Sequence, residues 1–595
     1  MRRSPAGEGK TPFHLASLSS FVARGIDLGT LSLSALVKNL FVSIAILLLA
    51  AGGRGDARSL NTLQSGSPTG PLSIHARGLY GENQLIAVLD SGLDYDNCAF
   101  AEADNSAPPI NTGTPSGGFA RGNIDLSRRK VVAYNFLFSC DQYPGVTGCD
   151  DPSNPFAYDN VNHGTRTAGA AAGDRFTPLV HDAGDGVAPA AKLIIQDAGY
   201  VNGDSCSQFP SLGCPVTKLS AAFEQAYQQG ARIHSNSWGD RQGVNRFSVP
   251  PTANYSATAR DVDLFAAAHP DMLIVFNAGN AGDSPSTVSS PGTAKNVLQV
   301  GGTGDSQASG DETLFRFSGA GPARDGRIKP DLVGPAMVEA PDAYSVYVSS
   351  PSAPSVTDRN CDASIQGGTS YASPSIAGAA ALVRQYFTEG FYPGGMRSSS
   401  DRITPTSALL KATLIAATRS VLYKVSAGGQ VAIEPAPSGA QGFGFPVLDD
   451  VLYFAGERAR LHVVDRRNGD GLAAGESASV SLNVRPGTRF KAALVWIDPA
   501  GTARGATDPA PVLVNDLDLI VTMPDGTVRR GNDTLHPGQA DRLNNVEAVA
   551  LNAPVAGAYK VTVSVRTLGE GPRQGFALVV SGDLSVAKTR RRAVR

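Results

Sequence analysis

The chain has 595 residues, of which 42% are hydrophobic and 17% are charged. This composition excludes a chain that is disordered throughout, and at about 100–200 residues per domain the length predicts two to four domains. Because 51 basic residues stand against 53 acidic ones, the net charge is −2, and no nucleic-acid partner or anionic membrane surface is expected.

An apolar segment, LFVSIAILLLAA, occupies residues 40–51 and follows Lys38. It is shorter than the roughly 20 residues that span a bilayer, so no stable membrane span is predicted. Its length and its flanking residues are typical of a secretory signal peptide. We interpret residues 1–53 as a leader and expect a secreted protein, extracellular or periplasmic, with a buried core helix as the alternative. The Gly, Ser, Thr and Pro content of residues 54–73 predicts a linker.

Residues 74–454 alternate between short runs rich in Val, Ile and Leu and stretches rich in Ala. The apolar runs lie at 84–90, 192–197, 231–237, 271–279 and 296–302. The Ala-rich stretches lie at 163–173, 217–230 and 373–387. Apolar strands that alternate with helices indicate an α/β domain with a parallel sheet, whose functional site lies at the carboxyl ends of the strands.

The pattern changes after residue 454 to short β-branched segments separated by turns. These segments lie at 477–485, 490–498, 517–528, 544–551, 557–566 and 575–582. The Pro-Asp-Gly sequence at 524–526 is a strong turn signal. We therefore predict that residues 455–585 form an all-β sandwich or barrel, followed by a solvated basic tail at 586–595.

Six cysteines are present, an even number without CxxC spacing or a Cys/His cluster that would indicate zinc. Two pairs are local, Cys140 with Cys149 and Cys206 with Cys214, which would leave Cys98 to pair with Cys361. Other connectivities and six buried free thiols remain open. Disulfides would fit an exported protein.

Three local sequences each place one polar side chain beside glycine at a strand end or a helix start. They are AVLDSGLD with Asp90, NHGTRTAG with His163 and GGTSYASP with Ser370. A serine hydroxyl is a weak nucleophile that needs a base to accept its proton, and the base needs a carboxylate to orient it. The three residues therefore predict nucleophilic catalysis.

In this order the three sequences resemble those of the subtilisin-like serine proteases, the subtilases of peptidase family S8, over residues 74–451. The resemblance implies a three-layer α/β domain with a mostly parallel sheet. It also implies that Asp90 orients the base, that His163 is the general base and acid, and that Ser370 is the nucleophile. The sequence NAGNAG resembles the segment whose asparagine, Asn280 here, completes the oxyanion hole with the Ser370 backbone N–H.

The resemblance also implies where substrate binds. SNSWG resembles the strand that pairs with extended substrate. The expected walls of the primary pocket are Ser237, Trp238, Gly239, Ala278 and Gly279, with Ser289 near its floor. For Trp238, a plain core position is the alternative. The expected partners are polypeptide substrates, the expected assembly is a monomer, and no cofactor is expected for the chemistry.

The C-terminal segments resemble the jelly-roll-like β-domain of the alkaline, Kp43-type subtilases, in which calcium stabilises loops. Four carboxylates supply oxygen ligands of the kind that calcium prefers, with acidic turn and surface positions as the alternative: Asp516, Asp518, Asp541 and Glu547. The β-domain is expected either to stabilise the catalytic domain or to help hold large substrates.

The sequence departs from the family pattern at several points. Arg166, Tyr371 and Asn277 replace residues common in the family, and only a short segment separates the leader from residue 74, where a folding propeptide is usual. Asp159, in a loop rich in Pro and Asn, is expected to be solvated.

The expected function is that of a secreted serine endopeptidase acting through an acyl-enzyme on Ser370. The alternative is a catalytically weak binding or adhesion protein on the same scaffold. An esterase of the α/β-hydrolase type is excluded, because Ser370 lacks the GxSxG context and the chain order of the three residues differs.

Overall fold

The structure is a computed structural model. It describes residues 57–112, 120–137, 159, 162–175, 185–198, 219–239, 253–282, 284–304, 313–343, 361–426, 429–535 and 537–586. The predicted signal segment and the cysteine pairs Cys140–Cys149 and Cys206–Cys214 lie outside these residues.

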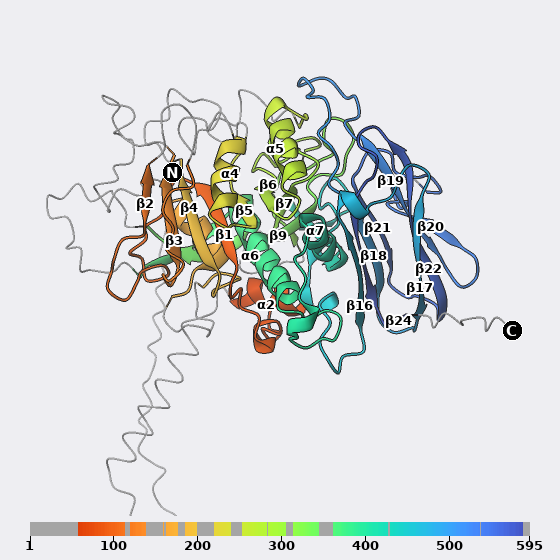
Figure 1. Ribbon diagram of the computed structural model, residues 1–595, viewed down its shortest axis with the longest axis horizontal. Coiled ribbons are helices and arrows are strands. Elements are labelled where there is room, and N and C mark those ends of the chain that lie inside the picture. The colour runs from red at the N-terminus through yellow and green to blue at the C-terminus, as the bar shows by residue number, and fades with distance from the viewer. Residues whose placement is uncertain are drawn as a thin grey trace, which may run out of the picture. The chain divides into compact units, whose positions relative to one another are not determined.

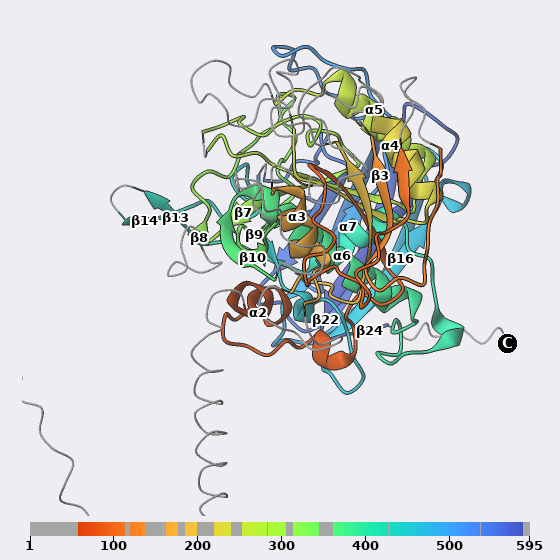
Figure 2. The ribbon, with the colours of Figure 1, turned by 90° about the vertical axis from the view of Figure 1, so that its left-hand side faces the viewer.

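The described part of the chain contains an 11-stranded, mostly parallel sheet, which confirms the predicted α/β class (Figure 1). Its strand order is β14-β13-β8-β7-β6-β5-β1-β4-β3-β2, with β9 also paired to β7. The parallel strands are β1 (Leu85–Asp90), β2 (Ile110–Thr112), β3 (Val131–Phe136), β4 (Lys192–Asp197), β5 (Ile233–Asn236), β6 (Leu273–Asn277), β7 (Leu298–Thr303) and β9 (Leu332–Pro335). At the far edge, β8 (Thr313–Leu314) runs antiparallel to β7, and β13 (Tyr423–Ser426) and β14 (Gly429–Ala432) form a hairpin that projects from the sheet (Figure 2).

Helices cover both faces of this sheet. The described helices are α2 (Ala57–Ser65), α3 (Gly164–Ala172), α4 (Leu219–Gln228), α5 (Ala257–Ala268), α6 (Thr369–Thr388) and α7 (Ser407–Ala416). The strand β1 shows the consequence, because Ile86 and Val88 join the core that contains α3, α6 and α7, whereas Ala87 and Leu89 join the core beneath α4 and α5. A strand buried on both faces has no polar alternation, which is why the apolar runs in the sequence predicted these strands.

Residues 54–73 differ from the predicted linker. Within this segment the helix α2 buries Leu60 and Leu63 in the apolar core of the α/β domain. The buried Gln64 side chain accepts hydrogen bonds from the backbone N–H groups of Ile74 and His75 at 2.9 and 3.1 Å. Apolar side chains spaced along one helix face therefore fix α2 to the domain. The polar composition of the segment as a whole did not predict this helix.

The C-terminal residues form two antiparallel sheets over a common core, as predicted for a β-sandwich. One sheet has the order β16-β23-β18-β21 and the other β20-β19-β22-β17-β24. Their strands are β16 (Arg460–Arg466), β17 (Ser477–Val484), β18 (Phe490–Val495), β19 (Asn515–Thr522), β20 (Val528–Arg530), β21 (Val546–Leu551), β22 (Gly557–Leu568), β23 (Phe576–Gly582) and β24 (Leu584–Val586). Side chains of both sheets, including Trp496 beside β18, share this core.

The first of these sheets is buried on its other face as well. In Figure 1, α7 lies between the parallel sheet and β18. Ala493 and Val495 of β18, and Ala577 and Val579 of β23, belong to the same apolar core as α7. The two parts of the chain therefore share one continuous hydrophobic core.

A buried polar cluster reinforces this junction. The Lys295 ammonium, which is 0% exposed, forms an ion pair with Asp498 and donates to the backbone oxygens of Pro499 and Val512 at 2.6 and 2.9 Å. Asn296 exchanges two hydrogen bonds with the Asp498 backbone, at 2.8 and 2.9 Å. Because a buried charge is tolerated only when it is paired and hydrogen-bonded, this cluster fixes the β-domain at a defined position.

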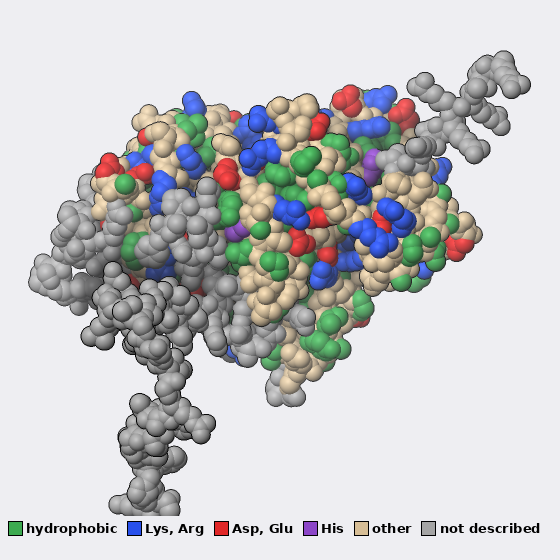
Figure 3. Space-filling view, turned by 90° about the horizontal axis from the view of Figure 1, so that it is seen from below, with side chains coloured by type: hydrophobic (Ala, Val, Ile, Leu, Met, Phe, Trp, Pro, Cys, Tyr) green, Lys and Arg blue, Asp and Glu red, His purple; other side chains and the backbone are tan. Residues whose placement is uncertain are grey.

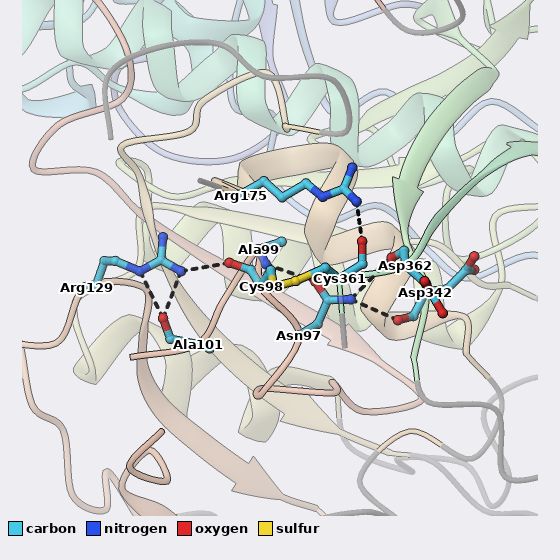
Figure 4. Close-up of a disulfide and its surroundings, with 9 residues drawn as sticks. All are labelled: Asn97, Cys98, Ala99, Ala101, Arg129, Arg175, Asp342, Cys361 and Asp362. Carbon is cyan, nitrogen blue, oxygen red and sulfur yellow. Dashed lines mark hydrogen bonds between the residues drawn. A yellow bond between two sulfur atoms is a disulfide. The ribbon is translucent and has the colours of Figure 1, made fainter. Parts of the chain in front are cut away.

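The disulfide between Cys98 and Cys361 confirms the one predicted pairing that falls within the described residues (Figure 4). It joins the segment after β1 to the start of β11 (Ala363–Gly367), which pairs with β10 (Met337–Pro341) and leads into α6. Beside it, the Asn97 side chain donates to the backbone oxygens of Asp342 and Asp362 at 3.0 and 3.3 Å. Two segments that are 263 residues apart in sequence are thereby held together.

On the face shown in Figure 3, Lys and Arg side chains lie interspersed with Asp and Glu side chains. Among the residues that the structure describes, no helix combines the length and apolarity needed to cross a bilayer.

Candidate active site

The carboxyl ends of neighbouring strands bring the predicted site residues to one edge of the sheet. Asp90 is the last residue of β1, Ser237 directly follows β5, and Asn280 follows β6 by three residues. In the sheet β1 pairs with β5, and β5 pairs with β6. Functional sites of parallel sheets lie at the carboxyl ends of the strands. The sequence motifs of this chain lie at that same edge.

Asp90 and His163 are in direct contact. His163 immediately precedes α3, and its Nδ1 lies 2.6 Å from Asp90 Oδ1. The same carboxylate oxygen accepts the Ser91 backbone N–H at 2.8 Å, and the Thr167 hydroxyl lies 3.3 Å from Oδ2. Because Asp90 is 1% exposed and held on several sides, it fixes the tautomer in which Nδ1 carries the proton and Nε2 can accept one.

The charges around His163 favour its protonated form. Burial alone would lower the pKa of the imidazole, but the Asp90 carboxylate, through its charge and its hydrogen bond, outweighs burial and raises the pKa above its usual value. The charge of Asp159 adds to this increase, and that of Arg166 opposes it. A base of this kind is well suited to accept a proton from a hydroxyl near neutral pH.

Ser370 is the second residue of α6, and it is 7% exposed. Its hydroxyl lies 3.3 Å from the Ser237 backbone oxygen and 3.5 Å from Asn277 Nδ2. The hydroxyl therefore donates to the Ser237 backbone oxygen in this structure. The N-terminus of the 20-residue helix α6 supplies a positive dipole end beside Ser370.

The orientation of the Asn280 amide is set by Thr369. Asn280 Oδ1 accepts the Thr369 backbone N–H and its hydroxyl, both at 3.0 Å. Since a backbone N–H can only donate, the atom facing it must be the amide oxygen. The Nδ2 group consequently remains available as a donor next to Ser370, which is the part that an oxyanion hole requires.

The predicted pocket residues fall into two groups. Ala278 and Ser289 are neighbours, since the Ser289 backbone N–H lies 3.3 Å from the Ala278 oxygen, and the Gly279 oxygen accepts from Gly319 at 2.8 Å. The Ser237 hydroxyl points inward, donating to the Ser370 backbone oxygen at 2.7 Å. Trp238 is 3% exposed, and its indole N–H donates to the Leu89 backbone oxygen at 3.1 Å. The side chains of Ser237 and Trp238 thus support the site from inside, as the alternative for Trp238 anticipated.

The expectation that Asp159 is solvated is wrong. Asp159 is 4% exposed and accepts hydrogen bonds from Ser91 and Thr165, which directly follow Asp90 and Gly164 in the chain. Burial raises the pKa of this carboxyl to about 6, although the hydrogen bonds from Thr165 and Ser91 oppose the increase. The polar sequence around Asp159 did not predict its burial. The only sequence signal for a role at the site is its position four residues before His163.

Asn277 contacts the Ser370 hydroxyl as described above, and the other two departures from the family pattern also lie at the site. Arg166 forms an ion pair with Asp342 at 2.6 Å, and Asp342 also accepts from Asn162 Nδ2 at 3.1 Å. The Tyr371 ring lies 6.0 Å from the His163 ring, centroid to centroid. Burial raises the pKa of Tyr371, so its hydroxyl is neutral beside the histidine.

The four carboxylates expected to bind calcium have ion-pair or hydrogen-bond partners within the protein. Asp516 and Asp518 both bind the Arg542 guanidinium, at 2.9 and 2.8 Å. Asp541 accepts from the side chains of Asn532 and Asn544 and from two backbone N–H groups. Glu547 Oε2 accepts the Leu519 backbone N–H at 2.6 Å, and burial raises the pKa of this carboxyl well above its usual range. Within the described residues, no group of three or more His, Cys, Asp or Glu side chains could hold a metal ion.

The model of the subtilase family, Peptidase_S8, matches residues 81–444. The chain is 25% identical over 632 residues to the serine protease/ABC transporter B family protein tagD of Dictyostelium discoideum, covering 85% of this chain and 32% of that protein. It is 32% identical over 120 residues to the serine protease AprX of Bacillus subtilis, covering 19% of this chain and 26% of that protein.

Among solved structures, the serine protease of Aeromonas sobria is similar, with 15% identity, a TM-score of 0.39, and coverage of 89% of this chain and 94% of that one. The chain spans about a third of the length of its Dictyostelium relative. Since the family model covers more than half of the chain and includes the residues that converge at the sheet edge, the chain belongs to the subtilase family.

Proposed function

We propose that the chain is a serine endopeptidase that cleaves polypeptides through an acyl-enzyme formed on Ser370. The observation that carries the proposal is the 2.6 Å contact between His163 Nδ1 and Asp90, at the sheet edge that also holds Ser370 and Asn280. Membership of the subtilase family supports the same activity.

In this mechanism His163 Nε2 accepts the Ser370 hydroxyl proton as Oγ attacks the scissile carbonyl. The resulting oxyanion accepts hydrogen bonds from Asn280 Nδ2 and from the Ser370 backbone N–H in the first turn of α6. When the C–N bond breaks, the imidazolium donates its proton to the departing amine and the acyl group stays on Ser370. A water molecule, deprotonated by His163, then releases the carboxylic acid and restores the hydroxyl.

We further propose that extended substrate lies along the backbone of residues 237–239, with its side chain against residues 278–279 and Ser289. The inward direction of the Ser237 and Trp238 side chains supports a wall made of backbone on that side. The substrate residue at this position would then be selected mainly by the shape of the pocket.

Export is part of the proposal, and the enzyme is expected to act as a monomer. The apolar segment 40–51 and the Cys98–Cys361 disulfide both fit an oxidising compartment outside the cytoplasm. N-terminal sequencing of protein recovered from the culture medium or periplasm tests this, with a mature N-terminus after residue 51 expected. A mature N-terminus upstream of Leu40 would contradict it.

The activity itself is tested with a denatured protein mixture as substrate, whose cleaved peptides are identified by mass spectrometry. The wild-type enzyme is expected to cleave the mixture and Ser370→Ala is expected to lose measurable cleavage. Equal cleavage by both would refute the role of Ser370. A wild-type protein that cleaves nothing but binds a partner would favour a binding or adhesion function.

A further inference from the structure

Asp159 connects the turn that follows Asp90 to the first residues of α3, which follow His163. Asp159 Oδ1 accepts the Ser91 hydroxyl at 2.9 Å, and the same hydroxyl accepts the Gly164 backbone N–H at 2.9 Å. Asp159 Oδ2 accepts the Thr165 backbone N–H at 2.8 Å and the Thr165 hydroxyl at 2.6 Å. One buried carboxylate is thus bonded to both of the segments that carry the Asp90–His163 pair.

These two segments are also in close contact. A Cβ atom added at Gly164 would lie 2.0 Å from the Gly92 backbone oxygen, so only glycine permits the observed approach. Ser91 continues the link, because its backbone N–H donates to Asp90 Oδ1, the oxygen that binds His163. A small displacement of this turn would therefore move the carboxylate that orients the imidazole.

We propose that Asp159 is a positioning residue for catalysis, whose carboxylate holds the segment that carries His163 against the turn that carries Asp90. This inference rests on the proposed function, since it assigns a role within the same site. Asp159 does not contact the reacting atoms, and it acts through Ser91, Gly164 and Thr165.

The charged and titratable groups that surround His163 can be named. Asp90 at the end of β1 and Asp159 before α3 carry negative charge, Arg166 on α3 carries positive charge and is paired with Asp342, and the Tyr371 hydroxyl on α6 is neutral. On the neighbouring strand β4, the Asp197 carboxylate accepts the Tyr134 hydroxyl at 2.7 Å. Removal of Asp159 therefore removes one of two negative charges that raise the His163 pKa.

The test is Asp159→Asn, which keeps the shape of the side chain. The amide oxygen can still accept both bonds from Thr165, so the variant loses the charge and the acceptor for Ser91. We expect kcat to fall about ten- to a hundredfold, the effect of losing a hydrogen bond to a charged group, with KM unchanged within about twofold. The acidic limb of the pH profile of kcat/KM should move to lower pH, because removal of the Asp159 charge lowers the His163 pKa.

Asp263→Asn is the matched control. Asp263 is 0% exposed and also accepts three hydrogen bonds, from the Tyr255 hydroxyl and from the backbone N–H groups of Lys295 and Asn296. It is not among the groups that shift the His163 pKa. This control should lower the melting temperature while leaving the acidic limb in place. If Asp159→Asn changes neither kcat nor the position of the acidic limb of the pH profile, the proposed positioning role of Asp159 is wrong.

Thr165→Val provides a second variant, should Asp159→Asn fail to fold. It removes one donor that holds Asp159 ionised, so the limb should move in the same direction by a smaller amount, and an upward movement or none would overturn the proposal. Both measurements presuppose an active wild-type enzyme. Cleavage that persists in Ser370→Ala would instead overturn the proposed function, so the two failures are distinguishable.

Discussion

At the scale of single residues, the Asn280 amide illustrates how one neighbour determines a chemical role. Thr369 fixes Oδ1 through two hydrogen bonds at 3.0 Å, and the opposite Nδ2 group then has a defined direction beside Ser370. An oxyanion hole depends on such preorganised donors, because they need no rearrangement when negative charge develops.

Asn280→Ala should therefore lower kcat by about 10²–10³-fold with little change in KM, since the lost hydrogen bond strengthens only in the transition state. The measurement is steady-state hydrolysis of a small peptide substrate. Thr369→Val, which keeps the backbone donor to Oδ1, should show a smaller loss. A kcat within about twofold of the wild-type value in Asn280→Ala would exclude this residue from the oxyanion hole.

The pH dependence of activity follows from the charges around His163. Its pKa is raised, so activity should fall as the pH decreases through a value above about 6.5, where the imidazole takes up a proton and can no longer act as a base. Arg166 lowers this pKa and forms an ion pair with Asp342, so its removal takes one positive charge from the surroundings of His163. Arg166→Met should accordingly move the acidic limb to higher pH, opposite to Asp159→Asn. A pH–rate profile on a neutral substrate measures this, and a downward shift would contradict it.

Much of the site could be predicted from the sequence. The residues that could not be predicted depend on contacts that form only in the folded chain. Asp90, His163 and Ser370 stand beside glycines that the tight turns require, so their local sequences are distinctive. Asp159 lacks such a signal, because its burial depends on contacts with Ser91 and Thr165 that only the folded chain creates. The inward direction of the Trp238 indole likewise depends on Leu89, far away in sequence.

At the scale of elements, strands buried on both faces were the easiest to predict. Continuous apolar runs correspond to β1, β4, β5, β6 and β7, whereas β3 (Val131–Phe136) was not among the predicted strands. The helix α2 was missed because its apolar residues are few and its partners lie in the core of the catalytic domain. Asp516 and Asp518 of β19 were among the residues expected to bind calcium, and in the structure both bind the Arg542 guanidinium, a contact that the sequence did not predict.

The ion pair between Lys295 and Asp498 gives a quantitative prediction at this scale. Both side chains are 0% exposed, so Lys295→Met leaves a buried carboxylate without its partner and should reduce the free energy of unfolding by about 3–5 kcal/mol. The double variant Lys295→Met with Asp498→Asn should lose less than the sum of the single variants, because no unpaired charge remains. Denaturant unfolding measures these values, and strict additivity would contradict the coupling.

At the scale of the whole molecule, the shared core leads us to expect that the β-domain stabilises the catalytic domain. Its inner sheet is buried on both faces, and α7 shares a core with β18 and β23. The alternative, a module used only to hold large substrates, would not need such a junction.

A chain that ends at residue 455 exposes the apolar face of α7 and leaves Lys295 without Asp498. It should therefore be insoluble, or should lose activity on small and large substrates alike together with its thermal stability. The measurements are soluble yield, melting temperature and activity on both substrate sizes. A truncated chain that is as stable as the full chain, and fails only on large substrates, would show that the β-domain acts in substrate binding.

The central claim is that Asp90, His163, Ser370 and Asn280 act on one substrate carbonyl. It is tested most directly by a crystal structure of the enzyme after reaction with a peptidyl phosphonate, whose phosphorus stands in for the tetrahedral carbon. The account predicts a covalent bond from Ser370 Oγ to phosphorus, a phosphoryl oxygen about 2.7–3.1 Å from Asn280 Nδ2, and His163 still bound to Asp90. Phosphorus attached to another residue, or a phosphoryl oxygen directed away from Asn280, would contradict it.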